Sequence, residues 1–210
     1  NHSRLIAFSC KKRGICPSCA TKRALIFAEH LYAAVLQPVA HCHMVFSLPK
    51  RLRPFFKYNR KNCALLFAAA WATIRELFNA VLPEGDPGAV MALQTAGDSI
   101  NFNPHLHAIV SDGVFDAAAN FYRLPAFSAQ AFTELFAHKV LTAMRNAGLI
   151  DQPVIDSILS WQHSGFSVWA GAPIEYDNAD SLQFLARYID RGPVANSRIE
   201  ITDDILSYLT

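Results

Sequence analysis

The hydrophobic positions of this chain recur at two different spacings, which predicts a mixture of helices and strands. Helical spacing predicts helices over residues 21–37, 62–82, 128–146, 151–162 and 179–191. Alternation and β-branched residues predict strands over residues 39–48, 89–95, 101–111, 121–124, 166–171 and 199–202. The hydrophobic content of 52% is enough for a substantial core.

The spacing of the predicted strands indicates how they pair. Only a Gly97-Asp98 turn separates strand 89–95 from strand 101–111, and so short a connection joins antiparallel neighbours. We therefore predict an α/β (α+β) two-layer sandwich, in which helices cover one face of a mainly antiparallel sheet of about five strands. The other face of the sheet would carry the functional site.

The central stretch of the chain reads Asn-Phe-Asn-Pro-His-Leu-His-Ala-Ile-Val-Ser over residues 101–111. In a strand, His105 and His107 project from one face and Leu106 from the other, because successive side chains alternate. Two imidazoles on one face are suited to holding a divalent cation. The antiparallel neighbour brings Gln94 close to this pair, as a neutral oxygen donor and third ligand, or as a strand glutamine that bonds to its neighbours.

A second His-x-His pair, His41 and His43, lies in the predicted strand 39–48. Strand geometry alone does not decide which pair binds metal. Cys42 stands between them at a position where a core residue is expected, a role that a free cysteine can fill. The two histidines either bind the metal directly or are strand histidines that lie near DNA phosphate.

Cysteines near the start of the chain predict a structural zinc site. Cys16-Pro-Ser-Cys19 is half of a zinc ribbon, Cys10 is a candidate third ligand, and His2 or His30 a fourth. A redox pair and three unrelated buried cysteines are the alternatives. Basic residues surround the motif, and this favours zinc.

The net charge of +2 conceals an uneven distribution. Residues 1–61 hold 12 of the 19 Lys and Arg residues but only one acid, Glu29. This half is suited to a polyanion, although a solvated basic face is an alternative. Within it, residues 50–61 interleave cations with Phe55, Phe56 and Tyr58. This pattern is useful for single-stranded nucleic acid, unless the two phenylalanines simply cap the core. The candidate DNA-binding cations are Lys11, Lys12, Arg13, Lys50, Arg51, Arg53, Lys57, Arg60 and Lys61.

The sequence shows no secretory signal, and its apolar run over residues 62–74 ends at Arg75, well short of the roughly 20 residues of a membrane span. We therefore expect no membrane partner and a cytoplasmic location, and the family resemblance of residues 94–113 and 184–195 implies that this location is nucleoid-associated and of bacterial type. The first residue is Asn1, and we interpret the chain as a fragment that lacks its true N-terminus.

Two stretches carry a family resemblance: residues 94–113 around the histidines, and Phe-Leu-Ala-Arg-Tyr-Ile-Asp-Arg-Gly-Pro-Val-Ala over residues 184–195. They resemble the transposases of rolling-circle insertion sequences in the HUH nuclease superfamily, which carry two tyrosines four residues apart on one helix. This chain keeps Tyr188 and has Phe184 at the earlier position. The resemblance implies a partial zinc-binding segment and linking helix in residues 1–36, and an HUH-type core, truncated at its C-terminus, in residues 37–210.

The resemblance also implies a reaction. His105 and His107, with Gln94, would hold Mg²⁺ or Mn²⁺, and Tyr188 would nick and rejoin single-stranded DNA at the ends of a mobile element through a 5′-phosphotyrosine. Because Phe184 has no hydroxyl, an inactive transposase remnant, or a non-enzymatic zinc-containing DNA-binding protein, is an alternative. A rolling-circle replication initiator or relaxase, which would use the same site, is a second.

Overall fold

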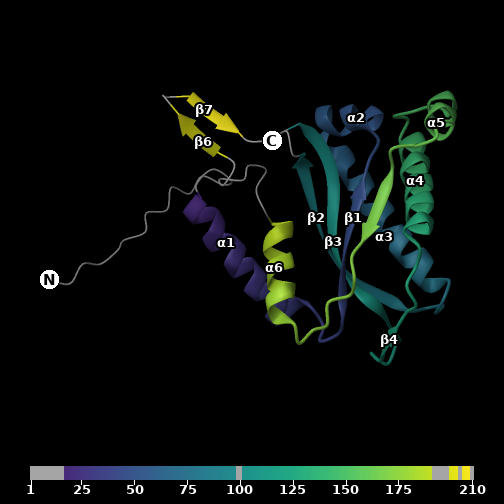
Figure 1. Ribbon diagram of the computed structural model, residues 1–210. Coiled ribbons are helices and arrows are strands. Elements are labelled where there is room, and N and C mark those ends of the chain that lie inside the picture. Colours follow the sequence, from purple (N-terminus) through teal and green to yellow (C-terminus); the bar gives the residue numbers. More distant parts are fainter. Residues whose placement is uncertain (1–16, 98–100, 191–198, 203–204, 209–210) are drawn as a thin grey trace.

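The computed structural model describes residues 17–97, 101–190, 199–202 and 205–208, and its centre is a five-stranded antiparallel sheet (Figure 1). The strand order is β2-β3-β1-β5, and β4 pairs with the far end of β3. The predicted α+β fold with an antiparallel sheet is therefore confirmed. The strands are β1 (His41–Ser47), β2 (Asp86–Ala96), β3 (Phe102–Phe115), β4 (Phe121–Arg123) and β5 (Ser167–Ala170).

The predicted helices are present with small shifts of their ends, and the described chain adds elements that the pattern did not indicate. The added elements are α2 and the strand β7, which pairs with β6. No helix within the described ranges has both the length and the hydropathy to cross a membrane. The bounds are α1 (Pro17–His30, continued by a π-helical turn, Leu31–Val35), α2 (Arg53–Tyr58, between 3₁₀ turns Lys50–Leu52 and Arg60–Asn62), α3 (Cys63–Asn79), α4 (Ala129–Asn146), α5 (Gln152–Leu159), α6 (Ala179–Ile189), β6 (Ile199–Thr202) and β7 (Ile205–Tyr208).

Local signals in the sequence fix where several helices begin and end. The side chains of Ser128, Asp151 and Asn178 accept hydrogen bonds from backbone N–H groups in the first turns of α4, α5 and α6. These are N-cap bonds, and each satisfies a donor that the helix itself leaves unpaired. After α4, Gly148 has a φ of 67°, a conformation that glycine adopts without strain.

The main core lies between one face of the sheet and helices α3 and α4. Phe46 of β1 and Leu106 of β3 point into it, and the ring of Phe46 meets that of Phe136 in α4 at a centroid distance of 5.1 Å. Ile74 of α3 is fully buried in the same cluster. This is the helical layer that the hydrophobic pattern predicts.

The opposite face of the sheet is partly covered by α1 and α6, whereas the sequence predicts helices on one face only (Figure 1). Leu31, at the end of α1, packs with Ile109 of the sheet and with Leu185 and Ile189 of α6. Residues at i, i+3, i+4 and i+7 give α6 an apolar side that must be buried. The sequence places these apolar residues on helices, but it does not indicate which face of the sheet covers them.

Candidate site of histidines and a tyrosine

Three histidines meet on the face of the sheet that α6 partly covers. In the observed register His107 of β3 lies opposite Val45 and His105 opposite Ser47, so both imidazoles project from this face, as the sequence predicts. Their ring centroids are 4.9 Å apart. His43 of β1 joins them, since its Nε2 lies 2.9 Å from Nδ1 of His107.

Helix α6 brings Tyr188 against this histidine cluster. The ring centroid of Tyr188 lies 5.3 Å from that of His107 and 5.9 Å from that of His43, edge to face in both cases. Tyr188 is 38% exposed, whereas His107 is 3% exposed. The structure therefore brings together the predicted histidine pair and the predicted tyrosine, although a long stretch of chain separates them.

The hydrogen bonds of the two β3 histidines leave one nitrogen of each ring for a ligand. His105 Nδ1 lies 2.7 Å from the carbonyl oxygen of Asn103. Because a carbonyl oxygen can only accept a hydrogen bond, Nδ1 carries the proton, and the neutral ring keeps its lone pair on Nε2. His107 has Nδ1 against His43, and its buried Nε2 has no hydrogen-bond partner. A buried nitrogen without a partner is costly unless something binds it.

Burial favours the neutral form of the His107 and His43 imidazoles. It lowers the pKa of His107 to about 4, assisted by the neighbouring His105 and His43, and it also lowers the pKa of His43. A neutral imidazole offers the lone pair that a metal needs, whereas an imidazolium does not. At neutral pH His107 therefore has the protonation state of a ligand.

Acidification should destabilise the metal-free chain. The folded pKa of His107, about 4, lies below the ordinary value of 6.5, so between these values the unfolded chain binds a proton that the folded chain does not. The contribution is complete above pH 6.5 and falls as the pH drops towards 4, on the order of 3 kcal/mol in total. Urea unfolding with a chelator across this pH range would measure it. A His107→Asn variant should show a shallower pH dependence, and an unchanged slope would contradict the assignment.

Gln94 lies beside the site, as its position opposite His105 in the β2–β3 register requires. Its side-chain nitrogen donates to the carbonyl oxygens of Tyr188, at 3.1 Å, and Ile189, at 3.4 Å. The glutamine thus ties the last turn of α6 to the sheet. Its nitrogen is occupied, and its oxygen is the atom that would serve as a ligand.

The second His-x-His pair divides between two environments. His43 belongs to the site, whereas His41 lies opposite Ser111, two positions further from His107, and is 4% exposed. Cys42 projects from the other face of the sheet, where burial and the adjacent Asp112 raise its thiol pKa to about 12. That thiol is protonated at neutral pH and is a poor metal ligand.

Across the described ranges, no three His, Cys, Asp or Glu side chains are arranged to hold a metal ion together. The pair His105 and His107 would therefore need oxygen ligands from outside that set, such as Gln94, water or phosphate. For the predicted zinc ligands, Cys10 and Cys16 lie outside the described residues, and Cys19 lies in the first turn of α1.

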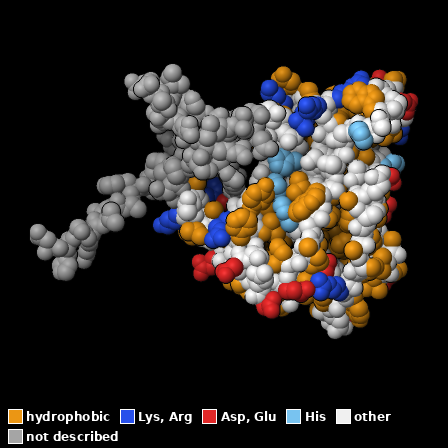
Figure 2. Space-filling view, in the orientation of Figure 1, with side chains coloured by type: hydrophobic (Ala, Val, Ile, Leu, Met, Phe, Trp, Pro, Cys, Tyr) orange, Lys and Arg blue, Asp and Glu red, His pale blue; other side chains and the backbone are white. Residues whose placement is uncertain are grey.

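The basic segment of residues 50–61 lies at the end of the sheet where β3 begins. The guanidinium of Arg60 lies 5.7 Å from the ring centroid of Phe102, the first residue of β3. Phe56 is fully buried in the core, which agrees with the alternative that this phenylalanine caps the core. Tyr58 is 83% exposed. Figure 2 shows Lys and Arg side chains along this end, above the histidines.

Two of the six predicted cations of this segment donate hydrogen bonds within the fold. Arg51 donates to the hydroxyl of Ser157, and Arg53 donates to the carbonyl oxygen of Leu48. The others, Lys50, Lys57, Arg60 and Lys61, are exposed. The remaining predicted cations, Lys11, Lys12 and Arg13, lie outside the described residues.

The structure thus places histidines of a central antiparallel strand beside a helical tyrosine, with a basic segment where that strand begins. Residues 88–208 match the family Y2_Tnp, described as "Putative transposase", so the chain belongs to this transposase family. Residues 1–48 match a second family, described as "Transposase zinc-binding domain", which supports the prediction of zinc. No solved structure matches the chain.

Two relatives are similar to about half of the chain. "Putative transposase y4qJ" of Sinorhizobium fredii (strain NBRC 101917 / NGR234) is 30% identical over 118 residues, which cover 54% of this chain and 29% of the relative. "Transposase for insertion sequence element IS801" of Pseudomonas savastanoi pv. phaseolicola is 32% identical over 119 residues, 55% of this chain and 27% of the relative. The matched stretch thus spans less than a third of either relative.

Proposed function

We propose that this chain is the part of a DNA transposase that cuts and rejoins single-stranded DNA through a covalent bond to Tyr188. One observation carries the proposal: the Tyr188 ring lies 5.3 Å from that of His107, whose buried Nε2 has no hydrogen-bond partner. A nucleophilic side chain beside an imidazole nitrogen that can bind a metal ion is an arrangement suited to phosphodiester transesterification. Membership of a transposase family supports DNA as the substrate.

His105 and His107 would hold a divalent cation through their Nε2 atoms, with the side-chain oxygen of Gln94 as a third ligand. Nitrogen ligands favour Mn²⁺ over Mg²⁺, while abundance favours Mg²⁺. The bound cation would polarise a phosphodiester oxygen and offset the charge that develops there. His43, against Nδ1 of His107, would keep that ring in the orientation and tautomer that leave Nε2 for the ion.

Tyr188 would supply the nucleophile. Its phenol oxygen, once it has lost its proton to water or a neighbouring base, attacks the scissile phosphorus in line. The bond from phosphorus to the 3′ oxygen breaks, the leaving oxygen takes up a proton, and a 5′-phosphotyrosine remains. Because the phosphodiester energy is retained in that bond, the 3′-hydroxyl of another strand can displace Tyr188 and join the DNA without ATP.

The basic segment and the zinc-binding region would bring the DNA to this site. Lys50, Lys57, Arg60 and Lys61 would neutralise backbone phosphates near the start of β3. Cys10, Cys16 and Cys19 would supply zinc ligands in the stretch that matches the zinc-binding family. The natural substrate would be the end of an insertion sequence, since the IS801 transposase is among the relatives.

The proposal is tested with the purified chain, Mn²⁺ and a random-sequence pool of single-stranded oligonucleotides. We expect a protein–DNA adduct that survives denaturation, and none in a chelator or with the same pool made double-stranded. A folded chain that binds Mn²⁺ but forms no adduct with any DNA would instead support the inactive remnant, which Phe184 in place of a tyrosine favours. An adduct that forms equally well with the double-stranded pool would overturn the proposal that the substrate is single-stranded DNA.

Replacing His43 should weaken metal binding without removing a ligand. His43→Ala removes the partner of His107 Nδ1, so the His107 ring can rotate or change tautomer. Loss of such a hydrogen-bond partner of a ligand typically lowers metal affinity by about 10- to 100-fold. Isothermal titration with Mn²⁺ would measure this. His43→Gln, which retains a hydrogen-bonding group, should recover part of the affinity. His41→Ala, a buried histidine on the same strand, is the matched control, and an equal loss there would show a general effect on β1.

A further inference from the structure

A hollow of about 590 Å³ opens beside the candidate site, between β5 and α6. Trp169 of β5 and Phe184 of α6 line it, and we call it the aromatic hollow. Trp169 is 54% exposed and Phe184 is 64% exposed. Exposed aromatic side chains that line a hollow of this size indicate a binding site, because leaving apolar surface in contact with water is unfavourable.

The aromatic hollow is continuous with the site of histidines and tyrosine. His43 lines the hollow, and its ring lies 5.3 Å from that of Trp169 and 5.9 Å from that of Tyr188. Trp169 lies opposite Val45 in the β1–β5 register, on the same face of the sheet as the histidines. In Figure 2 hydrophobic side chains flank the histidines at the centre of the visible face.

The side chains of the hollow fit a nucleobase better than a phosphate. Trp169 and Phe184 offer flat faces for stacking, which is tolerant of base identity. Arg187 adds a guanidinium that can stack or donate to a base edge. Asp180 also lines the hollow, and its carboxylate would repel a phosphate but accept a hydrogen bond from the amino group of a base.

We propose that the aromatic hollow binds one unstacked base of the DNA strand whose phosphate lies at Tyr188, held against Trp169 and Phe184. The inference rests on the proposed function for the identity of the strand. The proposal gives Phe184 a role of its own. At the position where the resembled family has a second tyrosine, this side chain would contact a base. It also explains why Trp169, at the edge of the sheet, is left uncovered.

The test compares two labelled oligomers of equal length and charge by fluorescence anisotropy, in a chelator so that no cleavage occurs. One is oligodeoxycytidine, and the other is a fully abasic sugar-phosphate chain. We expect the intact chain to bind the first about tenfold more tightly than the second. Trp169→Ala and Phe184→Ala should each reduce this preference severalfold, whereas Trp169→Phe should keep most of it.

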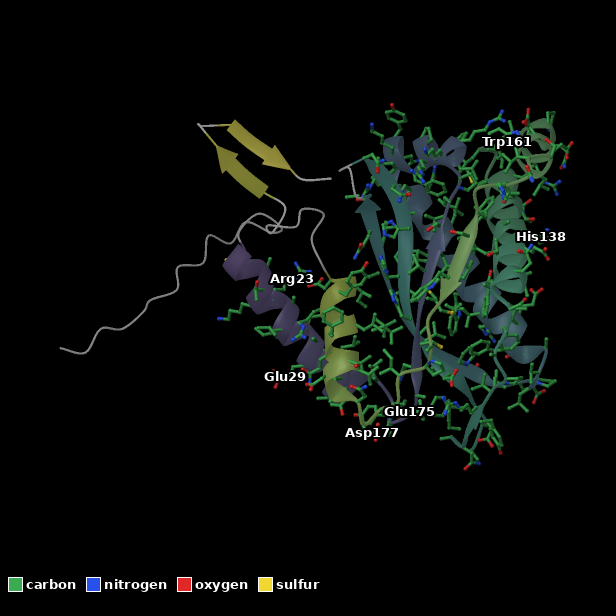
Figure 3. All side chains as sticks on the ribbon, in the orientation of Figure 1. Arg23, Glu29, His138, Trp161, Glu175 and Asp177 are labelled. Atoms are coloured by element: carbon green, nitrogen blue, oxygen red, sulfur yellow. The ribbon has the colours of Figure 1, made fainter. Side chains whose placement is uncertain are left out.

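Trp161→Ala is the matched control. Trp161 is a tryptophan of similar exposure, 51%, but it lies near α5, on the far side of the sheet from α6 (Figure 3). Equal binding of the two oligomers by the unmodified chain, or an equal loss of preference in Trp161→Ala, would overturn the proposal. Because the measurement needs neither metal nor Tyr188, a base preference in a chain that forms no adduct would reject the catalytic proposal alone.

Discussion

Tyr188→Phe should abolish the covalent adduct between this chain and single-stranded DNA. The substitution removes one oxygen atom and retains the ring that lies 5.3 Å from that of His107, so the packing of α6 is preserved while the nucleophile is lost. We expect adduct formation to fall by on the order of 10³-fold or more, because no other group would replace the attacking oxygen. Denaturing electrophoresis of a labelled oligonucleotide with Mn²⁺ would measure the loss.

Two measurements make this result specific. Tyr58→Phe removes the same oxygen from a tyrosine that is 83% exposed on α2, and it should leave the adduct unchanged. Binding of uncleaved DNA by Tyr188→Phe should equal that of the unmodified chain, since the phenol is proposed to act in chemistry. An adduct that persists in Tyr188→Phe would place the nucleophile elsewhere and refute the proposed function.

Replacing both β3 histidines should remove the response to divalent metal. In a His105→Ala, His107→Ala chain neither Nε2 remains, and the oxygen of Gln94 would be the one proposed side-chain ligand left. The affinity for Mn²⁺ should fall by more than the roughly 100-fold that loss of an outer partner causes, and the adduct should disappear. Isothermal titration with Mn²⁺ and the adduct assay together measure both effects.

The double variant also has an effect that separates metal binding from folding. Removing His107, whose pKa burial lowers, takes away a group that destabilises the folded chain in acid. The variant should therefore lose less stability on acidification than the unmodified chain. His138→Ala, on the outer side of α4 (Figure 3), is the control for changes in histidine content. Unaltered Mn²⁺ affinity in the double variant would show that the ion binds elsewhere.

The sequence predicts the sheet side of the site well because strand geometry is local. Alternation over residues 101–111 is sufficient to place His105 and His107 on one face, and the short connection between the two predicted strands is sufficient to bring Gln94 close to them. The exact pairing of Gln94 with His105 also depends on a register shift between Gln94 and Ala96, which the residue pattern does not indicate. The sequence does not decide whether His43 joins the pair, and the reason is physical. Its face relative to His107 depends on the register between β1 and β3, which a residue pattern within β1 does not contain.

The helical side of the site could be predicted only through the family resemblance. Nothing in the periodicity of residues 179–191 indicates that α6 packs over the histidines, because its apolar side could be buried against any hydrophobic surface. The sequence does not indicate the exposure of Trp169 for a similar reason. A tryptophan on a short strand usually packs in a core, and its exposure depends on what the neighbouring elements leave uncovered.

The contact between α1 and α6 bears on how this protein can be dissected. Ala28 and Leu31 of the α1 region share a buried cluster with Leu185 and Ile189, and Arg23 forms an ion pair with Asp190 just beyond α6. A cut after residue 36, where a boundary between zinc-binding and catalytic parts is expected, would strip the tyrosine helix of its hydrophobic neighbour. A shortened chain that keeps this contact must therefore retain the segment from Arg23 to Leu31.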